Sequence, residues 1–93
     1  MSARQEFSDR MRARLDGLRA EVDRLEHRVG QAETSLELEY YTLLEELKVK
    51  LEAAEQKFEL FLETHDDAWE TFRDDLEQSW ESMRNIIRAV TGP

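Results

Sequence analysis

The segment 34–62 carries apolar residues on two opposite sides of a helix, and this feature constrains the fold more than any other. The main apolar line repeats every three or four positions, the spacing that places side chains on one helical face. Its members are Leu36, Tyr40, Leu43, Leu47, Leu51, Ala54, Phe58 and Phe61. A second line of Leu38, Val49 and Leu60 advances by eleven residues and falls nearly opposite the first. Because a helix with two apolar faces needs neighbours on both sides, we predict a central helix here.

The composition favours helices and self-association. Of 93 residues, 38% are charged and 40% are hydrophobic, with one proline and three glycines, which is typical of long helices and coiled coils. A chain of this length has difficulty burying a large core alone, and long helices expose much surface. We therefore expect a homo-oligomer, either a dimer or a tetramer.

The net charge of −9 is unevenly distributed. Residues 1–30 carry seven arginines against six acidic residues, whereas residues 31–62 and 63–93 each carry three basic residues against eight acidic ones. The first third is thus suited to lie against the acidic remainder, either within the chain or across subunits. Exposed pairs of this kind select a register more than they stabilise it.

The N-terminal third predicts a helix with a narrow apolar seam. Ser2 is a candidate cap, and Gln5 three residues later completes a capping-box pattern. The seam alternates steps of three and four residues, as in a coiled coil. It consists of Phe7, Met11, Leu15, Leu18, Val22, Leu25, Val29 and Ala32.

Gly30 leaves two folds open. It would end the first helix if Thr34 and Glu37 form a new capping box, and the chain would then be a three-helix bundle. However, the apolar seam passes through Gly30 without losing phase, whereas a turn usually disrupts the phase. We therefore prefer one continuous helix over about 3–62, roughly 90 Å long.

The last helix is predicted over about 66–90, after a turn at about 63–65. Thr64 is a candidate N-cap and Gly92-Pro93 ends the helix. Its apolar face includes Trp69 and Trp80, which we interpret as core anchors. The predicted fold is an all-α helical hairpin, a single domain over 1–93, that assembles into a helical bundle or coiled coil.

This hairpin predicts two sets of packing residues. The short last helix covers only half of the long one, so the uncovered seam and the second apolar line must find another chain. The predicted oligomer interface is Leu15, Leu18, Val22, Leu25, Val29, Leu38, Val49 and Leu60. The predicted packing within the hairpin involves Leu47, Leu51, Phe58, Trp69, Phe72, Leu76, Trp80, Met83 and Ile87.

The sequence contains no pattern typical of an active site. Neither His27 nor His65 follows a glutamate by three residues, and there is no H-E-x-x-H motif, cysteine pair, EF-hand loop or Gly-rich phosphate loop. We therefore predict no enzymatic activity, no catalytic or metal-binding residues, no cofactor and no small-molecule substrate.

Charge also limits the possible partners. The arginines of the first third are offset by neighbouring acids, so we expect no nucleic-acid binding. The last helix is amphipathic, but its polar face is acidic, which anionic lipids repel; a membrane surface is therefore the less favoured alternative partner. The chain contains no cysteine, no secretory signal pattern and no apolar window long enough for a membrane span, and we expect a cytoplasmic protein.

Three motifs carry a resemblance. They are D-A-W-E-x-F-R-x-x-L-E-x-x-W-x-x-M-R from Asp67 to Arg84, Glu39-Tyr40 ahead of Leu-rich heptads, and A-A-E-x-K from Ala53 to Lys57. Over about residues 30–90 the chain resembles a family of small bacterial coiled-coil proteins labelled stress-response or apolipoprotein-like. The resemblance implies a long helix and a shorter amphipathic one, and it associates the chain with stress tolerance. Together these expectations describe a non-enzymatic, self-associating interaction module, with reversible binding to a lipid surface as the alternative.

Overall fold

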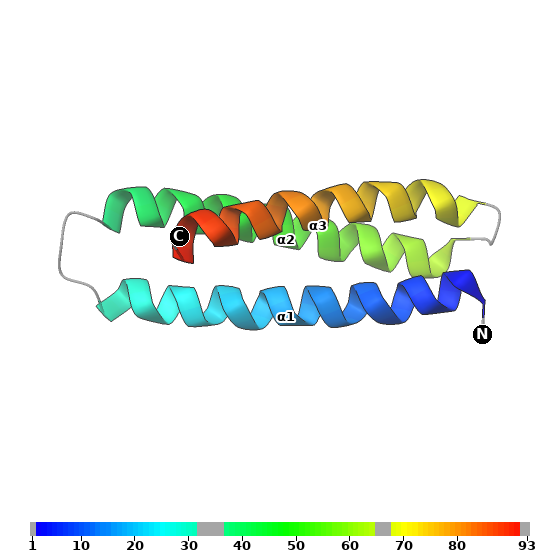
Figure 1. Cartoon of the computed structure of the whole chain (residues 1–93), viewed down its shortest axis with the longest axis horizontal. Coiled ribbons are helices and arrows are strands. Elements are labelled where there is room, and N and C mark those ends of the chain that lie inside the picture. The colour runs from blue at the N-terminus through cyan, green and yellow to red at the C-terminus, as the bar shows by residue number, and fades with distance from the viewer. Residues whose placement is uncertain (1, 32–36, 65–67, 92–93) are drawn as a thin grey trace.

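The computed structural model describes residues 2–31, 37–64 and 68–91, and these form three α-helices and no strand (Figure 1). Helix α1 spans Ala3–Gln31, α2 spans Glu37–Glu63 and α3 spans Trp69–Thr91. The all-α helical bundle predicted from the sequence is confirmed, in its three-helix form with a break near Gly30.

The continuous helix predicted over about 3–62 is wrong. Such a helix would be about 90 Å long, whereas the longest dimension of the molecule is 50 Å. Helix α2 runs back antiparallel to α1 (Figure 1), and Arg4 at the start of α1 donates a 3.1 Å hydrogen bond to the Phe61 carbonyl near the end of α2. The reversal brings the apolar seam of α1 against the same chain, so the seam needs no second subunit.

The three helices share one hydrophobic core. Its buried members are Phe7, Met11, Leu15, Leu18, Val22, Leu25, Leu44, Leu47, Leu51, Ala54, Phe58, Phe61, Leu76, Met83, Ile86 and Val90. Partly buried side chains that pack against it are Tyr40, Leu43, Trp69, Phe72, Trp80 and Ile87. All nine residues predicted to pack within the hairpin belong to one of these two groups, although α1 also contributes to their surroundings.

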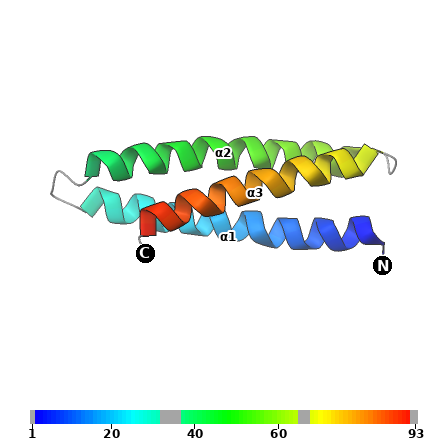
Figure 2. The same ribbon diagram turned by 45° about the horizontal axis from the view of Figure 1, so that its top comes forward.

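Helix α3 runs antiparallel to α2 and parallel to α1 (Figures 1 and 2). At the end of the bundle where α3 begins, aromatic rings from all three helices meet. Phe7 lies edge-on to Phe61 with centroids 5.4 Å apart, Phe72 lies 6.5 Å from Phe61, and Trp69 lies 6.1 Å from Phe7. Edge-to-face and tilted arrangements are those that aromatic quadrupoles favour. This aromatic cluster therefore joins α1, α2 and α3 at one end of the bundle.

The helix ends match the predicted caps in part. The Gln5 backbone N–H donates a 3.1 Å hydrogen bond to Ser2 Oγ, as expected of an N-cap. The Gln5 side chain, however, donates to Asp9 at 2.9 Å instead of completing a capping box. Thr64 follows α2 and does not start α3, because its hydroxyl donates to the Leu60 carbonyl at 2.7 Å. The predicted cap at Thr34 and the turn residue His65 lie outside the described residues.

Candidate interaction surfaces

The eight residues predicted to form an oligomer interface separate into three groups. Leu15, Leu18, Val22 and Leu25 are buried in the core of the single chain. Their assignment to an intersubunit contact is wrong, because α2 and α3 of the same chain cover this seam. Val49 and Leu60 are exposed, by 65% and 57% of their surface. The side chains of Val29 and Leu38 lie outside the described residues.

The side of α2 turned away from the core forms a surface that we call the α2 outer face. It comprises the exposed residues Glu39, Tyr41, Thr42, Glu45, Glu46, Val49, Glu52, Ala53, Gln56, Glu59, Leu60 and Glu63. Six of these are glutamates and none is basic. Tyr41, Val49 and Leu60 are large exposed hydrophobic residues among them. The face is therefore acidic with an apolar component. The eleven-residue spacing identified Val49 and Leu60 but not Tyr41, which does not share it.

The lysines of α2 are half-buried at its sides. The Lys48 ammonium lies 3.4 Å from the Glu26 carboxylate on α1 and 3.6 Å from Glu45. The hydrogen bond with Glu26, and then the charges of Glu26 and Glu45, raise the pKa of Lys48. Lys57 lies 3.3 Å from the Asp75 carboxylate on α3. Lys48 and Lys57 thus compensate acids at the helix contacts, and Glu45 is the one outer-face glutamate with an ion pair among the described residues.

Arginines of α1 line both of its contacts. On the α2 side, Arg19 pairs with Glu55, and this hydrogen bond raises the pKa of the Arg19 guanidinium. The Arg12 guanidinium lies 5.3 Å from the centroid of the Phe58 ring. On the α3 side, Arg10 and Arg14 both reach Glu77, at 3.4 and 3.2 Å. The expectation that the arginine-rich first third lies against the acidic remainder is confirmed for contacts within the chain.

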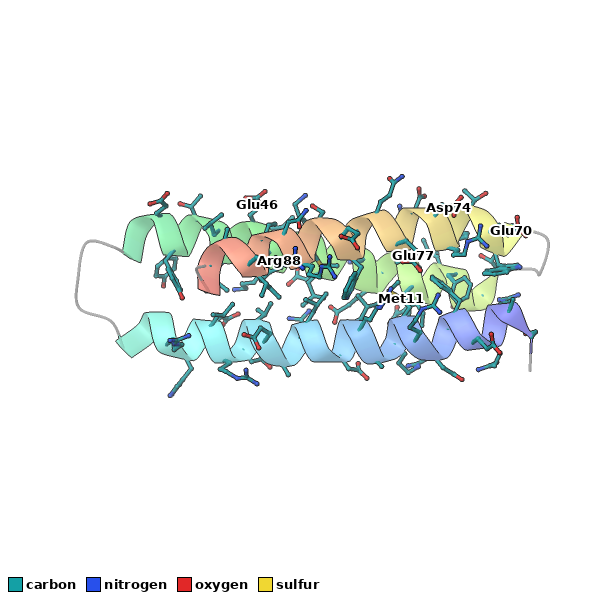
Figure 3. All side chains as sticks on the ribbon, in the orientation of Figure 1. Met11, Glu46, Glu70, Asp74, Glu77 and Arg88 are labelled. Atoms are coloured by element: carbon teal, nitrogen blue, oxygen red, sulfur yellow. The ribbon has the colours of Figure 1, made fainter. Side chains whose placement is uncertain are left out.

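A second surface runs along α1 and α3, and we call it the arginine face. Its members are Arg10, Arg14, Arg24 and Arg28 of α1 and Arg73, Arg84 and Arg88 of α3. On α1, positions 24 and 28 lie two heptads beyond 10 and 14 and so fall on nearly the same side of the helix. Figure 3 shows Glu77 between α3 and α1, with Arg88 farther along α3. The face therefore holds seven of the ten arginines in the chain.

Trp80 lies within the arginine face. The Arg14 guanidinium carbon is 4.2 Å from the centroid of its ring and that of Arg84 is 5.1 Å away. Cations over an indole ring gain about 0.5–1 kcal/mol at exposed sites. Arg84 Nε is buried and has no hydrogen-bond acceptor among the described residues, while another nitrogen of the same guanidinium lies 3.4 Å from the Glu81 carboxylate. Trp80 thus holds two cations at the surface between α1 and α3.

Two open grooves flank α2. The larger, of about 310 Å³, lies between α2 and α3 and is lined by Lys50, Ala53, Lys57, Asp75, Gln78, Ser79 and Ser82. The smaller, of about 220 Å³, lies between α1 and α2 and includes Arg12, Glu55 and Leu62. Within residues 2–31, 37–64 and 68–91, no group of three or more histidine, cysteine or acidic side chains is placed to hold a metal ion. No helix in the described part of the chain is long and apolar enough to span a bilayer.

No protein family, no curated protein and no solved structure matches this chain. The resemblance to small bacterial coiled-coil proteins stays a prediction from the sequence motifs. Any function is therefore argued from the two surfaces, the acidic and partly apolar outer face of α2 and the arginine face of α1 and α3.

Proposed function

We propose that this protein is a non-enzymatic interaction module that associates with further copies of itself through the α2 outer face. The observation that carries the proposal is the exposure of Val49 and Leu60, by 65% and 57%, on the side of α2 opposite the core. The core is already complete without them, since α1 and α3 cover the other face of α2. These two residues are therefore available to a partner without any rearrangement of the bundle.

The expected gain is modest. Full burial of a valine or leucine side chain contributes about 1.5–3 kcal/mol. Val49 and Leu60 are already partly covered, so their further burial would contribute about 1–2 kcal/mol each on the same scale. Association costs several kcal/mol of translational and rotational freedom. Val49 and Leu60 supply only part of the about −8 kcal/mol of a micromolar complex, so we expect a reversible oligomer that dissociates on dilution.

Light scattering across a dilution series tests this proposal. The mass should rise above the 11.0 kDa of one chain as the concentration increases. The double variant Val49→Gln and Leu60→Gln should weaken the association constant by ~10-fold or more, since each 1.4 kcal/mol is a factor of ten. Ala13→Gln with Ala20→Gln on the exposed side of α1 is the matched control and should leave the association unchanged.

A mass of one chain at every concentration would contradict the proposal, and so would equal effects of the two double variants. Circular dichroism of each variant should show the helix content of the unmodified protein, because all four positions are exposed. A role in stress tolerance and a cytoplasmic location are parts of the proposal that rest on the sequence alone.

The alternative of a lipid surface requires a different molecule from the closed bundle. Phe72, Trp69 and Trp80 of the amphipathic α3 pack against the core, so that helix would have to separate before its apolar face met lipid. Co-sedimentation with neutral and anionic vesicles distinguishes the two functions. Binding to both vesicle types, with a loss of oligomers, would favour the lipid function over self-association.

A further inference from the structure

We propose that the α2 outer face of one copy docks on the arginine face of a second copy, so that the contact is head-to-tail. This proposal rests on the self-association proposed above and names the surface that receives α2. It is carried by the complementary charges of the two faces, by their similar lengths and by the apolar groups that each presents.

The charges decide between two ways of pairing. If two α2 outer faces met each other, six exposed glutamates of one copy would face six of the other. Like charges brought together at an interface are unfavourable. The arginine face offers the opposite sign, with seven guanidinium groups. Among the acidic residues of α1 and α3, Glu21, Asp74, Glu77 and Glu81 are each paired with an arginine of this face.

The arginines at one end of the face are the most available. The Arg24 side chain is 68% exposed although its guanidinium lies 2.8 Å from Glu21. Arg28 and Arg88 lie in the last turns of α1 and α3, are exposed, and make no ion pair with any residue that the structure describes. On the α2 outer face, Glu46 and Glu59 are exposed and likewise have no ion pair within the described segments. Each face therefore carries charges that the single chain leaves uncompensated.

The two faces also match in extent and in apolar character. Residues 39–63 of α2 extend over about 36 Å, and residues 10–28 of α1 over about 27 Å, at 1.5 Å per residue. Trp80 is partly exposed on the arginine face, and Val49 and Leu60 are exposed on α2. Contact between these groups supplies apolar burial, while the charges set the orientation and speed the encounter.

A head-to-tail contact has a geometric consequence. Because each copy has one face of each kind, an open assembly of any length has a free α2 outer face at one end and a free arginine face at the other. Heterologous contacts of this kind give rings if they close and open chains if they do not. The mass is therefore expected to exceed that of a dimer at high concentration.

Salt dependence of the unmodified protein is the first test. Ionic strength of about 0.5 M screens charges over a few ångströms, against about 14 Å at about 0.05 M. A contact between opposite charges should weaken by ~10-fold or more over this range, whereas a contact between two acidic faces should strengthen because its repulsion is screened. Sedimentation velocity at both salt concentrations measures the change. Association that strengthens with salt would overturn the head-to-tail contact.

Charge reversal is the second test. One variant carries Glu39→Lys, Glu46→Lys, Glu59→Lys and Glu63→Lys, which leaves four lysines against two glutamates on the α2 outer face, and the other carries Arg24→Glu, Arg28→Glu and Arg88→Glu. The first variant then has two basic faces and the second has two acidic faces, so each alone should stay monomeric at about 0.05 M salt. An equimolar mixture should associate again, because the basic α2 face of the first variant meets the acidic face of the second.

The outcomes separate this proposal from the proposed function. If the arginine variant associates as well as the unmodified protein, the arginine face is not the docking surface, although self-association itself stands. If the mixture stays monomeric while the unmodified protein associates, the head-to-tail contact is likewise overturned. If the unmodified protein is a monomer under all conditions, a second copy is not the partner and both proposals fail. The salt series uses only the unmodified protein, so a variant that fails to fold leaves the test intact.

Discussion

Replacing Phe61 with alanine tests how much of the bundle depends on the aromatic cluster that joins its three helices. Phe61 is fully buried, and its ring contacts Phe7, Phe58 and Phe72 with centroids 5.4, 5.6 and 6.5 Å away. The Arg4 guanidinium lies 5.2 Å from the same ring. The side chain at position 61 therefore contributes to contacts with both other helices.

The cost follows from the volume removed. Truncation of a buried phenylalanine to alanine costs about 3–5 kcal/mol, which includes the cavity that the neighbours cannot fill. At roughly 0.05–0.15 kcal/mol per residue, a 93-residue chain has a total stability of about 5–14 kcal/mol. Phe61→Ala therefore removes between about a quarter and nearly all of the stability. With a urea m value of about 1–3 kcal/mol/M, the midpoint should fall by about 1–5 M.

Leu60→Ala is the matched control, because Leu60 is the preceding residue of the same helix and is 57% exposed. Its effect on the free energy of unfolding should stay within about 0.5 kcal/mol, as for other surface substitutions. Urea unfolding followed by circular dichroism at low protein concentration measures both variants without a contribution from association. Equal costs at positions 60 and 61, or a cost of Phe61→Ala below about 1.5 kcal/mol, would refute the assignment of the two faces of α2.

Two further substitutions test local features of the bundle. Gly17 is an exposed residue inside α1, and an added Cβ would meet nothing within 4 Å outside the backbone of its own helix and its chain neighbours. Gly17→Ala should therefore stabilise the protein by about 1 kcal/mol and raise the melting temperature by about 4–8 °C. A thermal scan that shows an unchanged or lower melting temperature would contradict this. The raised pKa of Lys48 contributes stability that is fully present below its unfolded value of about 10.4 and is lost as the pH rises through the folded value. Lys48→Met should therefore lower the free energy of unfolding by a constant amount between about pH 6 and about pH 10, where both the ammonium and the carboxylates are charged, and the difference should disappear at higher pH. A difference that grows above about pH 10 would be contrary to the ion pair with Glu26.

The periodicity of apolar residues identified most buried positions but did not identify the helices that pack against them. The steps of three and four residues that run through Leu15 and Val22 mark a face that must be covered, and both side chains are buried. The spacing would be the same whether this face is covered by a second chain or by α2 and α3 of the same chain. The prediction of an intersubunit seam therefore named buried residues and assigned them the wrong partner.

The arginine face was not predicted, because its members come from two helices whose relative placement depends on the fold. The sequence showed that arginines cluster in the first third. It did not show that Arg10 and Arg14 would lie beside Glu77 and Trp80, more than sixty residues away. The spacing of Arg84 and Arg88 on α3 is compatible with many helix rotations. The packing of Trp80 against the core selects the one in which Arg84 lies over the Trp80 ring together with Arg14 of α1.

By itself, the sequence determined that the chain is helical, which residues form most of the core, and that Val49 and Leu60 lie on the side of their helix opposite the main apolar line. Only the tertiary structure decided that the chain reverses between Gln31 and Glu37 and that α1 is covered by its own chain. The physical reason is that the spacing of hydrophobic residues is a property of one helix, and it is the same whether that helix packs against a second subunit or against another helix of its own chain. A partner within the chain avoids the loss of translational and rotational freedom on association, estimated at about 4–15 kcal/mol, so the reversal is favoured although the apolar phase continues through Gly30.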